Sequence, residues 1–376
     1  MKDKMRIGIN GRSMGGNIRD GISNVATNLF LNFPSDPEIE WVVFSPYKEL
    51  FPEIEAKGGF THIHPATNMK GGTWFYTKLI KDLRRYPVDV FWSPNQLLPP
   101  CVPQRTKTVL TVHDFTYLKY PETMTSLCRW NLRLRGASSI RKADVLVAVS
   151  ETTAADLKKI AGPNSTVEVI HNGIDPKVLF PEPSSEIPLI ELDRSEYFLS
   201  VGSIEPRKNL GVVLDAYEAL FEETGGDCPR WVVVYSNSWG SEALLGRMKE
   251  GKSSKGILMK RNVRTDELRR IYSNALALVF PSIYEGFGLP LLEAMACGCP
   301  VICSDIEICK EVCDDAALYL KDFDKLNFFS SLEMVKRLEK RKLLIKNGLA
   351  RSEVFYWSNI APKYLDLFKN VTMIKG

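Results

Sequence analysis

The chain has 376 residues, of which 44% are hydrophobic and 25% charged, the composition of a globular protein. That balance excludes a disordered, collagen-like or coiled-coil chain, and the length fits about two domains. Lys and Arg exceed Asp and Glu only by 49 to 45, which gives no reason to expect a nucleic-acid partner. Residues 1–185 hold 23 basic and 18 acidic side chains, so anionic partners are expected in this half.

Short apolar runs alternate with amphipathic segments along the chain. We expect strands at residues 6–10, 41–45, 88–93, 107–113, 145–150, 167–171, 197–201, 231–235, 277–281 and 301–304. We expect helices at residues 210–223, 265–274 and 325–350. Strands that are apolar on both faces suit a parallel sheet covered by helices, and their alternation with helices indicates a doubly wound α/β fold.

The domain boundary is expected in residues 176–188, where four prolines favour an extended linker. This predicts two Rossmann-like domains that face a cleft, residues 1–180 and residues 181–356. Residues 357–376 have the pattern of a terminal amphipathic helix. Ligands of open α/β sheets bind at the carboxyl ends of the strands, so the candidate site residues are sought there.

The segment 280–302 is the densest signal for a binding site. A strand is expected to end at Phe280, and a glycine-rich turn then leads into a helix that Pro290 suits at its start and Gly298 at its end. The N–H groups and the dipole at such a helix start form an anion site. Glu285 lies in the turn and Glu293 inside the helix, so we expect the first near a reacting centre and the second beside a ribose.

A second anion site is predicted after the strand that ends at Val201. Gly202 begins the turn, and Arg207 and Lys208 precede a helix for which Asn209 is a candidate N-cap. Two cations at a helix start match the charge of a diphosphate. Both anion sites in one domain therefore predict a nucleotide diphosphate as the ligand.

The first half contributes fewer candidate site residues. His113 ends an expected strand and would face the same cleft, and Gly21 lies in a loop before an expected helix.

Two basic segments with aromatic neighbours leave two interpretations open. One contains Trp74 and Lys78, and the other contains Arg129, Trp130 and Arg133. They are either solvated helix faces or a surface that meets an anionic membrane and a lipid-linked acceptor.

No metal site is predicted. Five of the eight cysteines fall within residues 297–313, but their spacing is unlike the paired Cys-x-x-Cys of zinc sites, so buried reduced thiols are expected. Asp322 and Asp324 are interpreted as a polar loop before a helix.

Taken together, the chain resembles glycosyltransferase family four, the retaining GT-B enzymes, and most of all the bacterial polysaccharide mannosyltransferases. The resemblance is carried by residues 111–114 (Thr-Val-His-Asp), 143–151, 169–175, 200–210 and 281–302. It implies that the first domain binds the acceptor, with the terminal helix packing back on it, and that the second domain binds a nucleotide sugar.

The resemblance also implies roles for individual residues. Arg207 and Lys208 would grip the donor diphosphate, Glu285 would contact the donor sugar, Glu293 would hold the ribose, and His113 would bond a sugar hydroxyl. Backbone N–H groups of Gly286, Phe287, Gly288 and Leu289 would assist Glu285, and backbone near Val263 would meet the base. Gly21 would sit over the diphosphate or the acceptor, and Gly202 would belong to the donor site.

The implied function is transfer of a hexose to a saccharide hydroxyl with retention of anomeric configuration. The expected donor is GDP-mannose, the expected acceptor is lipid-linked, and the expected process is polysaccharide or lipopolysaccharide O-antigen assembly. No cofactor or divalent metal is implied, because the two cations replace it. A UDP-sugar transferase of glucose, galactose or N-acetylglucosamine is an alternative, as are a nucleotide-sugar 2-epimerase and a non-catalytic nucleotide-sugar-binding subunit.

The expected location is cytoplasmic, because no apolar leader precedes the first strand. The basic segments add peripheral contact with the inner face of the cell membrane as an open alternative.

Overall fold

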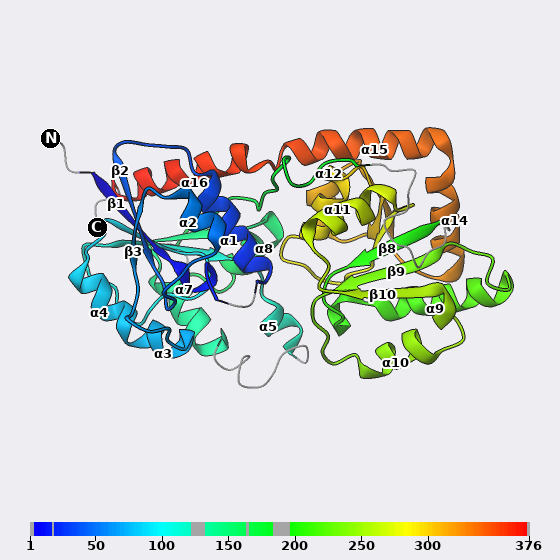
Figure 1. Ribbon diagram of the computed structural model, residues 1–376, viewed down its shortest axis with the longest axis horizontal. Coiled ribbons are helices and arrows are strands. Elements are labelled where there is room, and N and C mark those ends of the chain that lie inside the picture. The colour runs from blue at the N-terminus through cyan, green and yellow to red at the C-terminus, as the bar shows by residue number, and fades with distance from the viewer. Residues whose placement is uncertain (1–3, 17–18, 122–131, 163–164, 183–195, 374–376) are drawn as a thin grey trace. The chain divides into compact units, whose positions relative to one another are not determined.

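The computed structural model describes residues 4–16, 19–121, 132–162, 165–182 and 196–373. The chain forms two compact units (Figure 1). The first comprises Met1–Phe115, Ser126–Gly173 and Trp357–Gly376, and the second comprises Thr116–Thr125 and Ile174–Tyr356.

The first unit is built on a parallel sheet, in the order β3-β2-β1-β4-β5-β6-β7 among the described residues. Its central strands are almost fully buried, because helices cover both faces. The strands are β1 (Met5–Asn10), β2 (Ile39–Phe44), β3 (Phe60–Ile63), β4 (Val90–Ser93), β5 (Lys107–Val112), β6 (Val145–Ala148) and β7 (Thr166–Val169).

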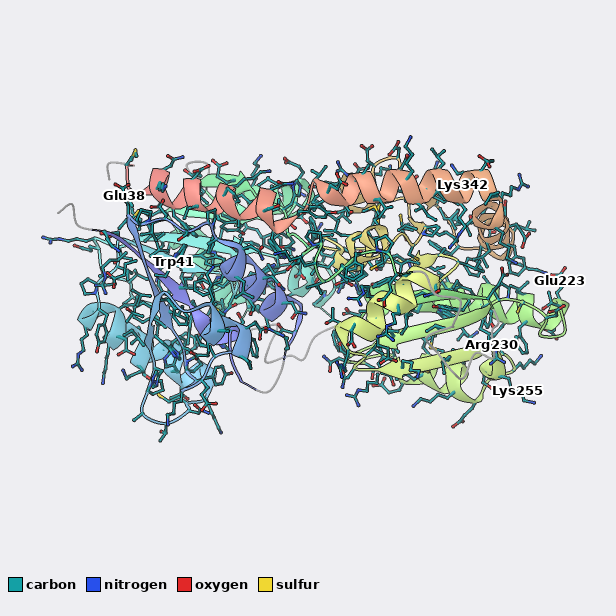
Figure 2. The ribbon with its side chains drawn as sticks, turned by 45° about the horizontal axis from the view of Figure 1, so that its top comes forward. Glu38, Trp41, Glu223, Arg230, Lys255 and Lys342 are labelled. Carbon is teal, nitrogen blue, oxygen red and sulfur yellow. The ribbon has the colours of Figure 1, made fainter. Side chains whose placement is uncertain are left out.

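The helices of this unit are α1 (Gly21–Asn32), α2 (Pro52–Lys57), α3 (Gly71–Tyr76), α4 (Lys78–Arg85), α7 (Ala137–Lys142), α8 (Glu151–Lys158) and α16 (Trp357–Val371), with shorter turns η1 (Gly11–Ser13) and η3 (Leu132–Gly136). The C-terminal helix α16 lies beside α1 (Figure 1). Its Phe368 is fully buried, with ring centroids 6.0 Å from Phe33 and 6.4 Å from Trp41, which Figure 2 labels. An apolar aromatic layer therefore joins the end of the chain to its first domain.

The second unit has a parallel sheet in the order β10-β9-β8-β11-β12-β13 among the described residues. Its strands are β8 (Tyr197–Val201), β9 (Arg230–Tyr235), β10 (Ile257–Arg261), β11 (Leu278–Phe280), β12 (Val301–Ser304) and β13 (Ala317–Leu320). Its helices and turns are α5 (Thr116–Lys119), η5 (Pro206–Lys208), α9 (Leu210–Glu223), α10 (Glu242–Glu250), η6 (Ser254–Gly256), α11 (Thr265–Asn274), α12 (Leu289–Ala296), α13 (Glu307–Cys313), α14 (Lys325–Lys336) and α15 (Leu338–Glu353).

The parallel sheets confirm the predicted doubly wound α/β fold, and each of the ten expected strands exists. The expected strands did not include β3, β10 or β13. All three are edge strands, and most of their residues are only partly buried. An edge strand needs no continuous apolar run, because one side of it meets solvent.

Two expected boundaries differ in the structure. The single helix expected at 325–350 is two helices, because Arg337 has extended backbone dihedrals between α14 and α15. The main segment of the second unit, Ile174–Tyr356, begins ahead of the proline-rich residues. The N–H of Ile174 donates to the carbonyl of Phe355 at 2.9 Å, which ties this residue to the second unit. No helix among the described residues is long and apolar enough to cross a membrane.

Candidate functional site

The central strands of the second sheet, β8 and β11, lie side by side. From β8 the chain moves to β9 and β10 on one side, whereas β11 leads to β12 and β13 on the other. The loops that follow two such strands diverge and leave room for a ligand. The two predicted anion sites are the loops that follow β8 and β11. Arg230 and Lys255, labelled in Figure 2, lie at the opposite end of this sheet, where β9 and β10 begin.

The loop after β8 brings two cations to the end of the strand. Gly202 has a φ of +141°, a backbone angle that residues with a side chain rarely adopt. A Cβ at this position would lie 3.5 Å from Cε of Lys208. Arg207 and Lys208 end η5, and each is only 9% exposed. Asn209 precedes α9 as expected, but its side chain makes no capping hydrogen bond. Capping residues have extended backbone, whereas Asn209 is left-handed.

Both cations contact one carboxylate from the loop after β11. Nζ of Lys208 lies 2.6 Å from Oε1 of Glu285, and Nη1 of Arg207 lies 2.6 Å from Oε2. Nη1 of Arg207 also donates to the carbonyl of Tyr284 at 2.8 Å. The structure thus brings together Arg207, Lys208 and Glu285, which were predicted to contact the diphosphate and the sugar of the donor.

A second carboxylate, Glu205, completes this charge cluster. Its Oε1 accepts from Nη2 of Arg207 at 2.7 Å and from the hydroxyl of Ser203 at 2.7 Å. Glu205 is 3% exposed. Two cations and two carboxylates therefore balance in a buried cluster, as buried charges require. Glu205 was not among the predicted site residues, although it lies in the same loop as Arg207.

The charge cluster controls the ionisation of Glu285. Burial by itself would raise the pKa of this carboxyl, but the charges of Lys208 and Arg207 outweigh burial and lower the pKa to about 2. Glu285 is therefore ionised throughout the neutral range and can accept hydrogen bonds only.

The loop after β11 ends at the N-terminus of α12. Gly288 has a φ of +92° and immediately precedes the helix, and Pro290 lies in its first turn as predicted. Gly286 and Phe287 are buried, and the Phe287 ring packs 5.8 Å from that of Phe355. Leu289, the first residue of α12, is half-buried. The first N–H groups of a helix have no partner within it, so this turn can donate to an anion.

Glu293 lies inside α12 and has a different environment. Its Oε2 accepts from the hydroxyl of Tyr272 in α11 at 2.9 Å. Burial raises the pKa of Glu293, and the Tyr272 hydrogen bond opposes that effect. Tyr272 was not among the predicted site residues, because only the packing of α11 against α12 brings it to Glu293.

Val263, the residue predicted to meet the base, follows β10 and is half-buried. Its neighbour Asn262 has a φ of +55°, and the Asn262 N–H donates to the carbonyl of Tyr235 at 2.9 Å. The turn after β10 is therefore bonded to the end of β9.

The remaining predicted donor-site residues, His113 and Gly21, belong to the first unit. Nε2 of His113 lies 2.7 Å from the carbonyl oxygen of Pro94, and a carbonyl only accepts, so Nε2 carries the hydrogen. Burial lowers the pKa of His113, although Asp114 and Asp20 favour the charged form. The neutral ring then has Nδ1 as an acceptor.

Gly21 is the first residue of α1. Asp20 caps this helix, because its Oδ1 accepts from the N–H of Ser23 at 2.8 Å. Among the described residues, a Cβ at Gly21 would meet nothing within 4 Å.

The predicted acceptor or membrane surface is partly wrong. Trp74 is fully buried, because its helix α3 turns this side chain into the core. Lys78 is half-exposed and pairs with Asp82, and Arg133 is exposed. Arg129 and Trp130 lie outside the described residues.

The aspartate and cysteine side chains that were considered as metal ligands take part in the fold. Asp324 caps α14 by accepting from the N–H of Asn327 at 2.8 Å. The five cysteines at 297, 299, 303, 309 and 313 are buried without disulfides, and burial raises the pKa of the Cys299 thiol to about 12. Among the described residues, no group of three or more His, Cys, Asp or Glu side chains is placed to hold a metal ion.

Comparison with known proteins identifies two matching family models. The model described as Glycosyltransferase Family 4 matches residues 20–178, and the model described as Glycosyl transferases group 1 matches residues 187–347. The O-antigen chain mannosyltransferase B of Escherichia coli is 28% identical over 293 residues, which cover 76% of each chain. The O-antigen chain mannosyltransferase RfbU of Salmonella typhimurium is 27% identical over 251 residues, 66% of this chain and 67% of that one.

A solved structure shares the fold. The Anabaena protein HepE in complex with UDP-glucose aligns with a TM-score of 0.71 over 97% of this chain and 100% of that chain, at 15% identity. The two Rossmann-like sheets are therefore those of a GT-B fold, as the resemblance implied.

Proposed function

The chain belongs to glycosyltransferase family 4, and we propose that it transfers mannose from GDP-mannose to a hydroxyl of a lipid-linked saccharide. The observation that carries this proposal is the convergence of Arg207 and Lys208 on Glu285 at the switch point of the second sheet. The choice of mannose, and of O-antigen assembly as the process, is supported by two relatives that are named O-antigen chain mannosyltransferases.

The donor diphosphate would take over the two cations from Glu285. The cluster is balanced without a ligand, and a diphosphate adds negative charge to it. Arg207 and Lys208 then bind phosphate oxygens, and the carboxylate of Glu285 accepts from hydroxyls of the sugar. The N–H groups at the start of α12 add donors for the same anion, and Glu293 would hold the ribose.

The reaction breaks the bond between the anomeric carbon and the diphosphate oxygen. The electron pair goes to that oxygen, and the two cations stabilise the charge where it develops. The acceptor hydroxyl attacks the same face of the anomeric carbon, and its proton passes to the leaving phosphate. This course retains the anomeric configuration, and the two cations do the electrostatic work for which other enzymes use a metal ion.

His113 would act as a neutral hydrogen-bonding group for the sugar. Its lowered pKa keeps the ring uncharged near neutral pH, and its Nε2 hydrogen is committed to Pro94. Nδ1 can then accept from a sugar hydroxyl, whereas a proton donor role would need the charged ring.

A UDP-sugar is the alternative donor. The HepE structure, which shares the fold, holds UDP-glucose. The base is expected to meet the turn that contains Val263 largely through backbone, so guanine and uracil both remain candidates.

The acceptor, if lipid-linked, would bring the enzyme to the inner face of the membrane. The first unit has exposed cations such as Arg133, and the Arg135 guanidinium lies 4.0 Å from the ring centroid of Tyr76. Sedimentation with vesicles of anionic lipid at low salt should pull down the protein, and absence of binding would contradict this location.

The proposed donor is tested by thermal shift with a panel of nucleotide sugars. GDP-mannose at 100 times its dissociation constant should stabilise the protein by about 2.7 kcal/mol, whereas UDP-glucose, UDP-galactose and UDP-N-acetylglucosamine should not. Stabilisation by a UDP-sugar alone would overturn the donor assignment.

The role of the cations is tested by substitution. Lys208→Ala should lower the rate of sugar transfer at least tenfold, because it removes one of the two charges at the leaving group. Lys255→Ala, an exposed lysine at the opposite end of the sheet, is the matched control. An unchanged rate in the Lys208 variant would contradict the diphosphate role.

A further inference from the structure

Tyr272 and Glu293 form a pair that the proposed reaction does not explain. Tyr272 is fully buried in α11, and its hydroxyl donates to Oε2 of Glu293 in α12 at 2.9 Å. Arg207 and Lys208 pair with Glu285 instead, and Glu293 takes part in no ion pair among the residues that the structure describes. A carboxylate near the donor site is thus held by one neutral hydroxyl.

Other buried tyrosines of this unit have a different partner. The hydroxyl of Tyr197 donates to the carbonyl of Ile271 at 2.8 Å, and that of Tyr217 donates to the carbonyl of Gly256 at 3.0 Å. A backbone carbonyl satisfies such a hydroxyl fully. Fold stability alone therefore does not require a carboxylate as the acceptor of Tyr272.

The Tyr272 hydrogen bond restricts where the Glu293 carboxylate can lie. A glutamate side chain on a helix has several rotamers, and each would place the carboxylate differently. An ionised carboxylate has about four acceptor positions, and Tyr272 uses one of them on Oε2. The other positions remain for the two neighbouring hydroxyls of a ribose.

We propose that Tyr272 is a positioning residue that orients Glu293 toward the ribose hydroxyls and thereby makes the site prefer ribonucleotides to 2′-deoxyribonucleotides. The inference rests on the proposed function, which assigns the ribose to Glu293. The role of Tyr272 and the preference for ribonucleotides both follow from the contact between α11 and α12. A group held in place before binding selects its ligand more strongly than one that must be ordered by it.

The experiment compares nucleotide binding by isothermal titration calorimetry. The ligands are GDP, UDP and their 2′-deoxy forms, and the proteins are the wild type, Tyr272→Phe and Tyr197→Phe. Tyr197→Phe is the matched control, because it also removes a buried tyrosine hydroxyl that contacts α11, but one that bonds the carbonyl of Ile271 and not Glu293. Thermal melting of both variants checks that the fold is kept.

The expected result is a wild-type preference for the ribonucleotide of at least tenfold. Tyr197→Phe should retain it, whereas Tyr272→Phe should reduce it at least threefold. A purely structural role would weaken the ribonucleotide and the deoxynucleotide equally. In a Glu293→Gln background the ribose preference should be lost, and adding Tyr272→Phe should change it no further.

Two outcomes overturn the inference in different ways. If Tyr272→Phe keeps the full wild-type preference, Tyr272 does not position Glu293, and the proposed function is unaffected. If the wild type binds ribonucleotide and deoxynucleotide equally, the ribose role of Glu293 in the proposed function fails as well. The ranking of GDP against UDP tests the donor base separately from both.

Discussion

Replacing Glu285 by Gln should tighten the binding of a nucleoside diphosphate and at the same time slow sugar transfer. In the structure the carboxylate of Glu285 pairs with both Arg207 and Lys208, at 2.6 Å from each. A diphosphate that binds these cations must therefore compete with Glu285. Glutamine keeps the shape of the side chain but removes the charge, so the competition ends. The donor sugar, in contrast, loses its carboxylate contact.

The size of the effect follows from the ionisation of Glu285. Its pKa is lowered from 4.5 to about 2, so the protein stabilises the ionised form by about 3 kcal/mol at roughly 1.4 kcal/mol per pKa unit. In the wild type, binding of the diphosphate loses all of these about 3 kcal/mol only if the diphosphate displaces Glu285 completely from the two cations. Since the carboxylate can share the cations, we expect about half, which corresponds to about tenfold tighter binding.

The assay is calorimetric titration of GDP and UDP, combined with the rate of sugar transfer. Glu182→Gln is the matched control, because Glu182 also pairs with two arginines, Arg269 at 2.6 Å and Arg270 at 3.7 Å, away from the charge cluster. Its nucleotide binding should equal that of the wild type. Unchanged or weaker nucleotide binding in a folded Glu285→Gln variant would refute the competition between Glu285 and the diphosphate.

Three further predictions concern acid stability, packing and metal dependence. Because the pKa of Glu285 is lowered in the folded protein, its ionised carboxylate stabilises the fold above about pH 4.5, and this stabilisation is lost as the pH falls toward 2. In urea unfolding over this pH range, the free energy of unfolding of the wild type should fall by up to about 3 kcal/mol more than that of Glu285→Gln. Phe368→Ala should lower the free energy of unfolding by about 3–5 kcal/mol, because its ring is fully buried among aromatic rings. Lys369→Ala, which breaks the partly exposed ion pair with Asp36 beside it, should lower it far less. Equal cost of the two substitutions would contradict the packing argument. The transfer rate should persist in EDTA, and a loss that magnesium restores would show that the cations do not replace a metal.

Sequence patterns predicted the strands of the sheet interiors, because a strand covered on both faces must be apolar along its whole length. The edge strands β10 and β13 carry no such constraint, so their sequences gave no strand signal. The break between α14 and α15 was missed for a related reason: Arg337 is neither Gly nor Pro, and only its backbone dihedrals reveal the interruption.

The site residues divide in the same way. Glycine turns and adjacent cations are local signals, so the sequence alone made Gly202, Arg207, Lys208 and Glu285 candidate site residues. A solvated aromatic and a buried one look alike in sequence, which is why Trp74 was misplaced on the surface.

The sequence by itself determined the fold class and the loops that carry the candidate chemistry, because apolar periodicity and turn residues act over a few neighbouring positions. Only the tertiary structure decided how the charges are balanced. Lys208 and Glu285 are 77 residues apart, and Tyr272 and Glu293 are 21 apart. Such partners meet because parallel strands bring their carboxyl ends together and helices pack across them, and no local pattern records which side chains then touch.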